Sequence, residues 1–421
     1  MSGLEKAIGG EVSRRSFGFY ANNRTAYKLG RMATIECPSD TELFDFTQGA
    51  LQGKFVFTLS AGLTASQTLS LASYWPALLF SEIRVKTMDG RQMGDSLRFY
   101  GGKTRERMLL CNTGDYATGA KLLQEWPEGI TYQAASVDAA GDITVEFSHK
   151  ISDHIFMLKH YYPGQLHKGF ILEIDLCSIT DIFSDSNSGT EVALITNAEI
   201  QDLEYYVDLV RIDAESEANM LRIRNEGNLY VDFSQVISDV YDYASGSTLR
   251  KEQIGINGRI KNCIVTQYLS SGRGSSGNAF WREFVLNGLT GYRFFVMNKP
   301  INHRIINVSD YSAVDGSTTQ LAKAQFELYK ALEKEYLNPN TYGPNTSAAD
   351  RSDTFAIGVK IQKGNENLNP GYITSEVDNT RNNTRFELDL SGASASTVYF
   401  HTEVDKRIQL LPGGVVNEVR L

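Results

Sequence analysis

The residues best suited to metal chemistry are four histidines in one short stretch. His149, His154, His160 and His167 lie within 19 residues, and the whole chain has six histidines. A zinc site needs neutral imidazoles that converge at about 2 Å from the ion. The spacings of five, six and seven residues match no compact ligand motif, and they mix the faces of any strand. We therefore predict scattered surface or hydrogen-bonded histidines and no metal site.

Nucleotide binding and serine-based hydrolysis find no support in the sequence. The glycine-rich stretch SSGRGSSGNAF (270–280) lacks the Lys-Ser/Thr end of a phosphate-binding loop, and no strand and helix flank it. We predict a flexible surface loop there. The G-x-S-x-G pattern of a serine nucleophile elbow does not occur in the chain.

Paired carboxylates are the remaining candidates for catalysis, because many glycoside hydrolases act through two of them. Glu173, Asp175, Asp202 and Glu204 are examples, but the sequence places no two of them at a defined separation. Glu173 and Asp175 share the strand face opposite their apolar neighbours, so we expect both to face solvent. The sequence therefore yields no catalytic, cofactor-binding or metal-binding residue.

The composition is that of a soluble globular chain. Its 421 residues suit two domains, and 42% of them are hydrophobic and 22% charged. The 21 tyrosines and 21 phenylalanines favour sheets. No signal peptide is evident, and the longest mainly apolar run, 71–80, is too short to span a bilayer. Four widely separated cysteines predict reduced, partly buried thiols.

The charge of the chain is uneven. A net charge of −9 argues against binding of nucleic acid over the whole surface. Residues 1–31 contain six basic and two acidic side chains, so the net charge is +4 for this segment and −13 for the remainder of the chain. We predict an N-terminal arm, 1–31, that is partly ordered at best and either aids solubility or docks on a subunit, nucleic acid or anionic membrane. Its candidate contact residues are Arg14, Arg15, Arg24, Lys28 and Arg31.

Two-residue alternation of apolar side chains dominates the rest of the sequence and predicts short strands. Clear examples are 53–60, 81–87, 142–149, 169–176 and 228–233. The Asp-Gly pair that follows 81–87 predicts a tight turn.

The stretch VALITNAEIQDLEYYVDLVRID (192–213) changes phase in its middle. Val192 to Ile200 are apolar at even positions, whereas Leu203 to Leu209 are apolar at odd positions. One extra residue near Gln201–Asp202 would produce this change as a β-bulge within one long strand. A tight turn between two antiparallel strands is the alternative.

The order of segments is similar in two halves of the chain. A polar stretch around 237–253 separates them, and each half contains helical material, within 103–126 and at 318–339. The fold class predicted is mainly β, with two consecutive jelly-roll β-sandwiches and helical insertions in loops. The predicted boundaries are 32–240 for the first sandwich, 241–253 for a linker and 254–421 for the second.

Three stretches carry a resemblance to a known family. They are HKGFILEIDL with VALITNAEIQDLEYYVDLV, INGRIKNCIVTQYL after the polar stretch, and the closing VYFHTEVDKRIQLLPGGVV. Over about 32–421 the chain resembles the double jelly-roll major capsid proteins of icosahedral DNA viruses and tailless phages. The resemblance rests on hydrophobic pattern and segment order.

The resemblance implies a structural protein without enzymatic activity or cofactor. Such proteins form homotrimers, which are pseudo-hexameric capsomers of an icosahedral virion, and their N-terminal arm lies near the interior. The implied partners are the chain itself, neighbouring capsomers, penton, minor capsid or internal membrane proteins, and an internal lipid membrane, without sequence-specific nucleic acid binding. The implied location is the virion capsid, assembled in the host cell cytoplasm.

Two other functions fit a β-sandwich protein. A carbohydrate-active or carbohydrate-binding protein would have a secretory signal and an aromatic groove with two carboxylates. A virion spike or fibre would show repeats or an extended shaft, and neither is present in the sequence.

Overall fold

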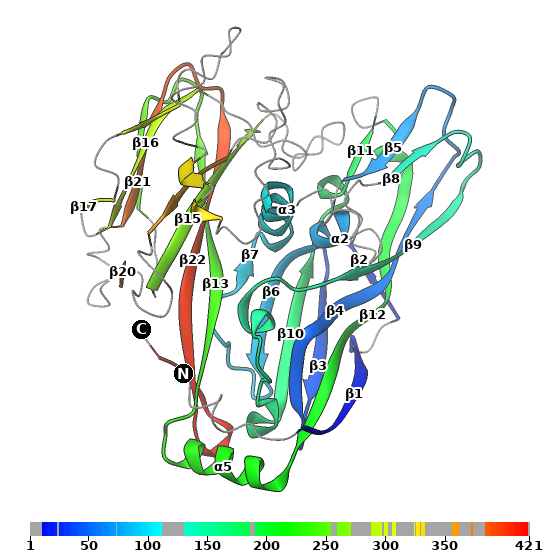
Figure 1. Ribbon diagram of the computed structural model, residues 1–421. Helices are drawn as coiled ribbons and strands as arrows, with labels where there is room; N and C mark the ends of the chain where they lie inside the picture. The colour runs from blue at the N-terminus through cyan, green and yellow to red at the C-terminus, as the bar shows by residue number, and fades with distance from the viewer. Residues whose placement is uncertain are drawn as a thin grey trace.

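A computed structural model describes most of the chain and shows two β-sandwiches side by side (Figure 1). The described residues are 11–22, 25–72, 74–111, 130–185, 190–253, 259–270, 288–296, 299–301, 305–308, 324, 326–328, 330–332, 356–361, 372–373 and 384–419.

The first sandwich consists of two four-stranded sheets with additions. One sheet has the order β1-β12-β4-β9 with β2 beside β12, the other has the order β3-β10-β6-β7, and β11-β5-β8 form a small third sheet. Its strands are β1 (Glu11–Tyr20), β2 (Ala26–Lys28), β3 (Met32–Pro38), β4 (Leu43–Leu59), β5 (Thr68–Leu71), β6 (Phe80–Thr87), β7 (Leu97–Arg98), β8 (Ile130–Gln133), β9 (Gly141–His149), β10 (Gly169–Leu176), β11 (Phe183–Asp185) and β12 (Ile195–Ile212). Its helices are α2 (Trp75–Leu78) and α3 (Tyr100–Cys111).

The second sandwich follows helix α5 (Ala214–Asn225) and repeats this plan. One sheet has the order β13-β22-β15-β19 with β20 and β23 at its margins, and the other has the order β14-β21-β16-β17 with β18 beside β16. Its strands are β13 (Tyr230–Tyr243), β14 (Leu249–Gln253), β15 (Arg259–Leu269), β16 (Leu289–Val296), β17 (Lys299–Pro300), β18 (Ile306–Asn307), β19 (Ala356–Lys360), β20 (Tyr372–Ile373), β21 (Arg385–Leu390), β22 (Ser396–Leu410) and β23 (Val416–Val419).

Both sandwiches have the same strand order. When the eight strands of each pair of sheets are numbered along the chain, one sheet has the order 1-8-3-6 and the other 2-7-4-5, in both halves. This is the arrangement of a jelly roll, in which eight strands form two facing sheets. The helical insertions also correspond, because α3 follows the fifth strand of the first roll and the helical residues near 328 follow the fifth strand of the second. The prediction of two consecutive jelly rolls with helical insertions is therefore confirmed.

The core of each roll lies between its two sheets. The first core contains stacked and edge-on rings such as Phe44, Phe46 and Phe170, and the second contains Phe294, Phe386 and Phe400. Three described cysteines, Cys37, Cys177 and Cys263, are buried free thiols, and burial raises the pKa of each.

Strand β10 shows how alternation builds this core. Phe170, Leu172, Ile174 and Leu176 are buried, while the residues between them are half-buried. The carboxylates on that outer face, predicted to be solvent-facing, form ion pairs across the sheet with β6: Arg84 with Asp175 at 2.5 Å and Lys86 with Glu173 at 2.6 Å. The predicted Asp-Gly turn follows β6, where the Thr87 amide donates to the Arg91 carbonyl at 2.8 Å and Gly90 has φ 86°.

Strand β12 confirms the predicted bulge. It runs unbroken from Ile195 to Ile212, and its register with β4 shifts between Gln201 and Glu204. Asp202 has a left-handed φ of 52°. Because this residue absorbs the change of phase, Ile200 and Leu203 both face the core.

The predicted N-terminal arm, 1–31, is wrong from residue 11 onward. Residues 11–20 form β1, which pairs with β12 from Glu11 to Tyr20 and is the first strand of the first roll. The sequence did not predict this strand, because its first seven residues, 11–17, are exposed and show no apolar alternation. Residues 1–10 lie outside the described residues.

The predicted linker, 241–253, is also wrong. Residues up to 243 belong to β13, which pairs with β22, and 249–253 form β14, which pairs with β21. The Ser-Gly-Ser turn between them lies within the second roll, with Gly246 at φ 77°. The connection between the rolls is α5, so the predicted boundary after residue 240 falls inside a strand.

Helix α5 was not predicted, although its ends carry ordinary helix signals. Asp213 caps it by accepting a hydrogen bond from the Ser216 amide at 2.8 Å. Acidic residues occupy its first turn and Arg222 and Arg224 its last, which suits the helix dipole. The predicted helix at 318–339 is helical at its described positions 324, 326–328, 330 and 331, and Ala324, Leu328, Ala331 and Leu332 are buried.

The bulge of β12 gives the first prediction. Asp202→Val should lower the free energy of unfolding by about 1–2 kcal/mol, because a β-branched residue resists the left-handed conformation. Asp202→Asn should change it little, since Asn tolerates that conformation and both variants lose the same exposed ion pair with Lys54. Urea denaturation of the two variants measures the difference, and equal stabilities would contradict the bulge.

Candidate functional site

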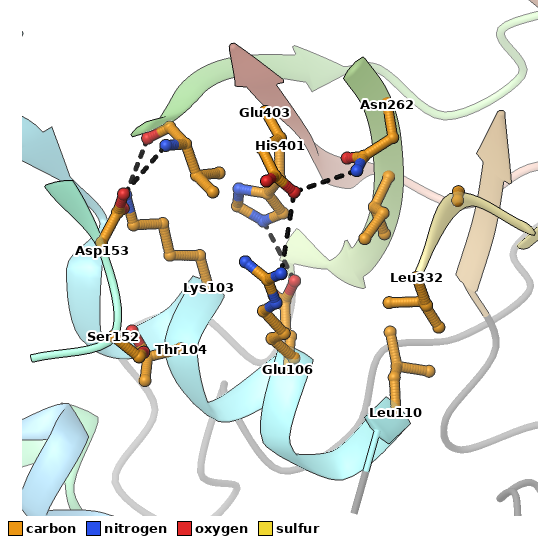
Figure 2. Close-up of a pocket in the computed structure, with 14 residues that line it drawn as sticks. Lys103, Thr104, Glu106, Leu110, Ser152, Asp153, Asn262, Leu332, His401 and Glu403 are labelled. Atoms are coloured by element: carbon orange, nitrogen blue, oxygen red, sulfur yellow. Dashed lines mark hydrogen bonds and ion pairs between the residues drawn. The ribbon is translucent and has the colours of Figure 1, made fainter. Parts of the chain in front are cut away.

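Helix α3 lies between the two rolls and joins them through buried charged groups (Figure 2). Glu106 on this helix is 2% exposed. Its carboxylate accepts hydrogen bonds from the hydroxyls of Thr266, at 2.9 Å, and Tyr268, and lies 3.0 Å from Nε2 of His401. Glu106 belongs to the first roll and all three partners belong to the second, so this contact fixes one roll on the other.

A second buried group on α3 repeats this connection. Nζ of Lys103 lies 2.6 Å from the Asp153 carboxylate and donates to the carbonyl of Val236 in β13 at 2.8 Å. The other carboxylate oxygen of Asp153 accepts from the Val236 amide at 3.0 Å. Burial lowers the pKa of Lys103, and the facing Asp153 carboxylate offsets part of this effect.

The second roll contributes its own buried acid to the same contact. Glu403 on β22 accepts a hydrogen bond from Asn262 at 2.9 Å and lies 3.6 Å from Arg107 of α3. Burial raises the pKa of Glu403, but the charges of Arg107 and Lys261 and the Asn262 hydrogen bond outweigh burial, so the pKa lies below its ordinary value. We call Lys103, Glu106, Arg107, Asp153, His401 and Glu403 the junction cluster.

An apolar patch completes the junction. Leu110 of α3 packs in one cluster with Tyr268, Leu328, Leu332 and Tyr399 of the second roll. The cavity beside these residues has a volume of about 30 Å³, which is room for about two water molecules. Ligand pockets are roughly 300–1,000 Å³, so the junction is a packed joint between domains.

The residues of the junction cluster were not singled out in the sequence. Lys103, Glu106 and Arg107 lie in a charged helical stretch, and such stretches usually face solvent. Asp153, the carboxylate partner of Lys103, lies 50 residues downstream, and the other partners come from β13, β15 and β22, more than 120 residues downstream. A single sequence holds no signal that would bring these segments together.

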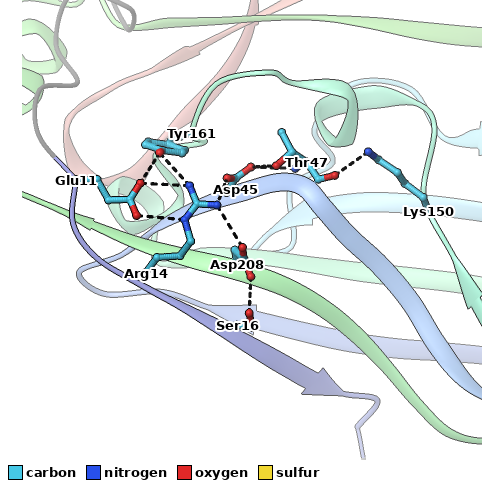
Figure 3. Close-up of polar contacts among 8 residues, drawn as sticks. All are labelled: Glu11, Arg14, Ser16, Asp45, Thr47, Lys150, Tyr161 and Asp208. Carbon is cyan, nitrogen blue, oxygen red and sulfur yellow. Dashed lines mark hydrogen bonds and ion pairs between the residues drawn. The ribbon is translucent and has the colours of Figure 1, made fainter. Parts of the chain in front are cut away.

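Arg14, one of the predicted arm residues, lies in a different place, on the edge strand β1 of the first roll (Figure 3). The guanidinium of Arg14 on β1 lies 2.9 Å from Asp45 and 3.3 Å from Asp208, and it also contacts Glu11 and Tyr161. The hydrogen bond from Arg14 lowers the pKa of Glu11, with a smaller contribution from Tyr161. Arg14 therefore neutralises two nearly buried carboxylates of its own chain.

The five predicted contact residues do not form one site. Arg15 pairs with Glu42 at 2.6 Å. Lys28, at the end of β2, and Arg31 are exposed, and Arg24 lies outside the described residues.

Comparisons with known proteins agree with the strand order. The solved PBCV-1 virus capsid matches with a TM-score of 0.61 at 9% identity, over 98% of this chain and 98% of that chain. The Faustovirus major capsid protein matches with a TM-score of 0.61 at 9% identity, over 95% of this chain and 91% of that chain. The mavirus major capsid protein matches with a TM-score of 0.50 at 9% identity, over 98% of this chain and 92% of that chain.

The chain has the double jelly-roll fold of viral major capsid proteins. No protein-family model and no curated protein matches its sequence.

In this double jelly-roll chain three of the four histidines make the predicted hydrogen bonds, and they do so in the core and not at the surface. Nε2 of His149 lies 2.7 Å from the Tyr100 hydroxyl, Nε2 of His154 donates to the Met93 carbonyl at 2.6 Å, and Nε2 of His167 lies 2.8 Å from the Tyr162 hydroxyl, whereas His160 is exposed. Among the described residues no three His, Cys, Asp or Glu side chains are arranged to hold a metal ion. No helix in the described ranges has the length and apolar character to cross a membrane.

The junction cluster gives the second prediction. Lys103→Met should lower the free energy of unfolding by about 3–5 kcal/mol, because it leaves the Asp153 carboxylate buried without its cation. Arg222→Met is the control, since it removes an exposed pair with Glu226 at 3.6 Å on α5 and should cost less than about 1 kcal/mol. Calorimetry or urea denaturation compares the two, and similar costs would contradict a tightly paired junction.

Buried histidines give the third prediction, a loss of stability in acid. Burial lowers the pKa of His149 to about 3 and the pKa values of His154 and His167 to about 4. Because these values lie below that of free imidazole, about 6.5, the unfolded chain takes up protons first. The stability from these groups is complete above pH 6.5 and is lost as the pH falls toward 4.

The test uses His154→Asn, because Asn tolerates the left-handed φ of 62° at this position. Urea denaturation at pH 7, 6 and 5 should show that the slope between pH 6 and 5 falls by about 1 kcal/mol per pH unit. The exposed His160→Asn is the matched control, because it makes the same substitution outside the core. An unchanged slope for both variants would contradict the buried, neutral state of His154.

Proposed function

We propose that this chain is a major capsid protein that assembles with itself into trimeric, pseudo-hexameric capsomers of an icosahedral virion. One observation carries the proposal: two jelly rolls with identical strand order stand side by side in one chain. The chains that match over nearly their full length are capsid proteins of PBCV-1, Faustovirus and mavirus.

The physical argument starts from the repeat. Three copies of a chain with two like domains form a ring of six similar units, and a near-hexagonal block can tile a surface. The two rolls differ in sequence, so such a ring has threefold symmetry and only approximate sixfold symmetry. A double domain in one chain supplies this shape with three polypeptides instead of six.

The junction between the rolls supports a structural role. A shell subunit must keep one shape in many copies, and its two domains must therefore hold a fixed orientation. Glu106 and Lys103 are hydrogen-bonded across the junction from one helix, and the apolar patch at Leu110 packs beside them. Such a joint resists hinge motion, because opening it would separate buried charges from their partners.

The remaining parts of the proposal concern location and partners. The chain would reside in the virion capsid, assemble in the host cell cytoplasm, and contact neighbouring capsomers, penton, minor capsid or internal membrane proteins, and an internal lipid membrane. Its net charge of −9 argues against binding of nucleic acid over the whole surface, and sequence-specific binding of nucleic acid is not part of the proposal. Of the five candidate contact residues, the exposed Lys28 and Arg31 stay available for an inner partner, whereas Arg14 and Arg15 bind carboxylates of their own chain.

The oligomeric state gives the fourth prediction. Gel filtration coupled to light scattering should show a compact trimer of about 140 kDa, three times the 46.8 kDa of one chain. Electron microscopy of concentrated or native material should show hexagonal blocks or closed shells. Incubation with a panel of glycans should release no product. A monomer at micromolar concentration that also cleaves or binds glycans would contradict the proposal and favour a carbohydrate-active or carbohydrate-binding protein.

A further inference from the structure

We infer that Lys103 and Asp153 condense to an amide bond once the chain has folded, so that each subunit cross-links itself. Lys103 lies on α3, and Asp153 directly precedes the short helical turn His154–Met157. The bond would join two segments of the first roll that both hold Val236 of the second roll. This inference goes beyond the proposed capsid function and does not depend on it.

The starting point is a lysine and a carboxylate that meet away from solvent (Figure 2). Nζ of Lys103 lies 2.6 Å from the Asp153 carboxylate, and the two side chains are 5% and 4% exposed. The attraction within a buried ion pair barely repays the free energy of removing both charges from water. A neutral product in the same place therefore has an advantage over the two charges.

Burial also favours the reactive form of the amine. It lowers the pKa of Lys103, and the facing Asp153 carboxylate offsets part of this effect. A lysine amine attacks carbon only when it is neutral, and burial is a common way in which proteins obtain such a lysine. Moving one proton along the 2.6 Å contact turns the ion pair into a neutral amine beside a neutral carboxylic acid.

The second oxygen of Asp153 is held as an acyl-transfer reaction requires. Oδ1 accepts hydrogen bonds from the backbone amides of His154, at 2.8 Å, and Val236, at 3.0 Å. When Nζ bonds to Cγ, the negative charge of the tetrahedral intermediate develops on Oδ1. Fixed donors at about 2.7–3.1 Å from such an oxygen form an oxyanion hole, which stabilises this charge.

The atoms and charges of the step balance within the pair. The Nζ lone pair of Lys103 forms the bond to Cγ of Asp153, and the bond between Cγ and Oδ2 breaks. Two of the three ammonium protons leave with Oδ2 as water, and the third stays on the amide nitrogen. One positive and one negative charge disappear together, so the reaction needs no other reactant.

The product keeps the hydrogen bonds that the ion pair already makes. The remaining N–H of Lys103 still donates to the Val236 carbonyl, which lies 2.8 Å from Nζ, and Oδ1 of Asp153 still accepts from both amides. The junction cavity of about 30 Å³ is lined by Lys103 and Asp153 and has room for the released water. The reaction thus leaves no polar group of this pair without a partner.

A second lysine pair in the first roll serves as an internal comparison. Nζ of Lys86 also lies 2.6 Å from a carboxylate, that of Glu173 on the outer face of the sheet. These side chains are 25% and 21% exposed, so water reaches both charged groups. We expect no amide there, because the short distance is present but the burial is not.

Mass spectrometry of the intact full-length chain, denatured after folding, tests the inference. The mass should lie below the mass of the sequence by one water molecule. After digestion, the peptide with Lys103 should be joined to the peptide with Asp153, whereas the peptides with Lys86 and Glu173 should be separate.

Three variants identify the groups that react. Lys103→Arg keeps a cation without the amine, so its mass should equal that of its own sequence. Asp153→Asn should form the same amide and lose the mass of one ammonia molecule in place of water. Lys86→Arg is the matched control and should lose one water molecule like the parent.

The parent protein alone decides the outcome, so no variant has to fold. A chain that keeps its full mass after days in the folded state at neutral pH overturns the inference. A mass that is low by one water molecule with the Lys103 and Asp153 peptides unlinked also overturns it, because the dehydration then lies elsewhere. Light scattering reports the oligomeric state of the same samples separately, so loss of the cross-link leaves the capsid proposal standing.

Discussion

Pairing of buried charge between the rolls is the constraint on which the rest of the molecule depends. Glu106 in the first roll finds its hydrogen-bond donors in the second, and Glu403 in the second roll finds a cation in the first. A buried ion pair adds little stability over apolar packing, but a mispaired one is costly, so such pairs select one arrangement. The junction cluster thus specifies a single docking of two domains that could otherwise pack in several ways.

Because of that docking, the outer sheets of the two rolls have different surroundings although their strand order is the same. The outer sheet of the second roll is completed by α3, whereas the outer sheet of the first roll balances its charges alone through Arg14, Asp45 and Asp208. The buried charges of this sheet are therefore paired without a neighbouring domain, while its edge strand β1 is uncovered in the described part of the chain. Fusion into one chain allows this division, because each roll can evolve for one set of neighbours.

Alternation of apolar residues was sufficient to predict strands that have one buried face and one solvent-facing face. β10 followed its pattern residue by residue, and the phase change in β12 located the bulge at Asp202. β1 was missed because it is exposed on both faces, and β13 was cut short because its outer face is covered by polar contacts from the other roll. The junction cluster depends on contacts between distant segments, which local patterns do not encode, and the rolls were recognised by their order of elements instead.

Because the first strand of each roll pairs with the last one, neither roll can close until its last strand has been synthesised. Arg14 meets Asp208, 194 residues downstream, and Ser234 meets Asp405, 171 residues downstream. Ribosomes add roughly 5–20 residues per second, so β1 waits on the order of 10 to 40 seconds before β12 emerges to pair with it. During that time the growing chain carries unpaired strand edges, and non-local pairing of this kind is slow even after release. Unpaired strand edges and apolar surface in such a partly made chain are prone to aggregate, so the long separation of paired strands makes each roll most vulnerable before its last strand emerges.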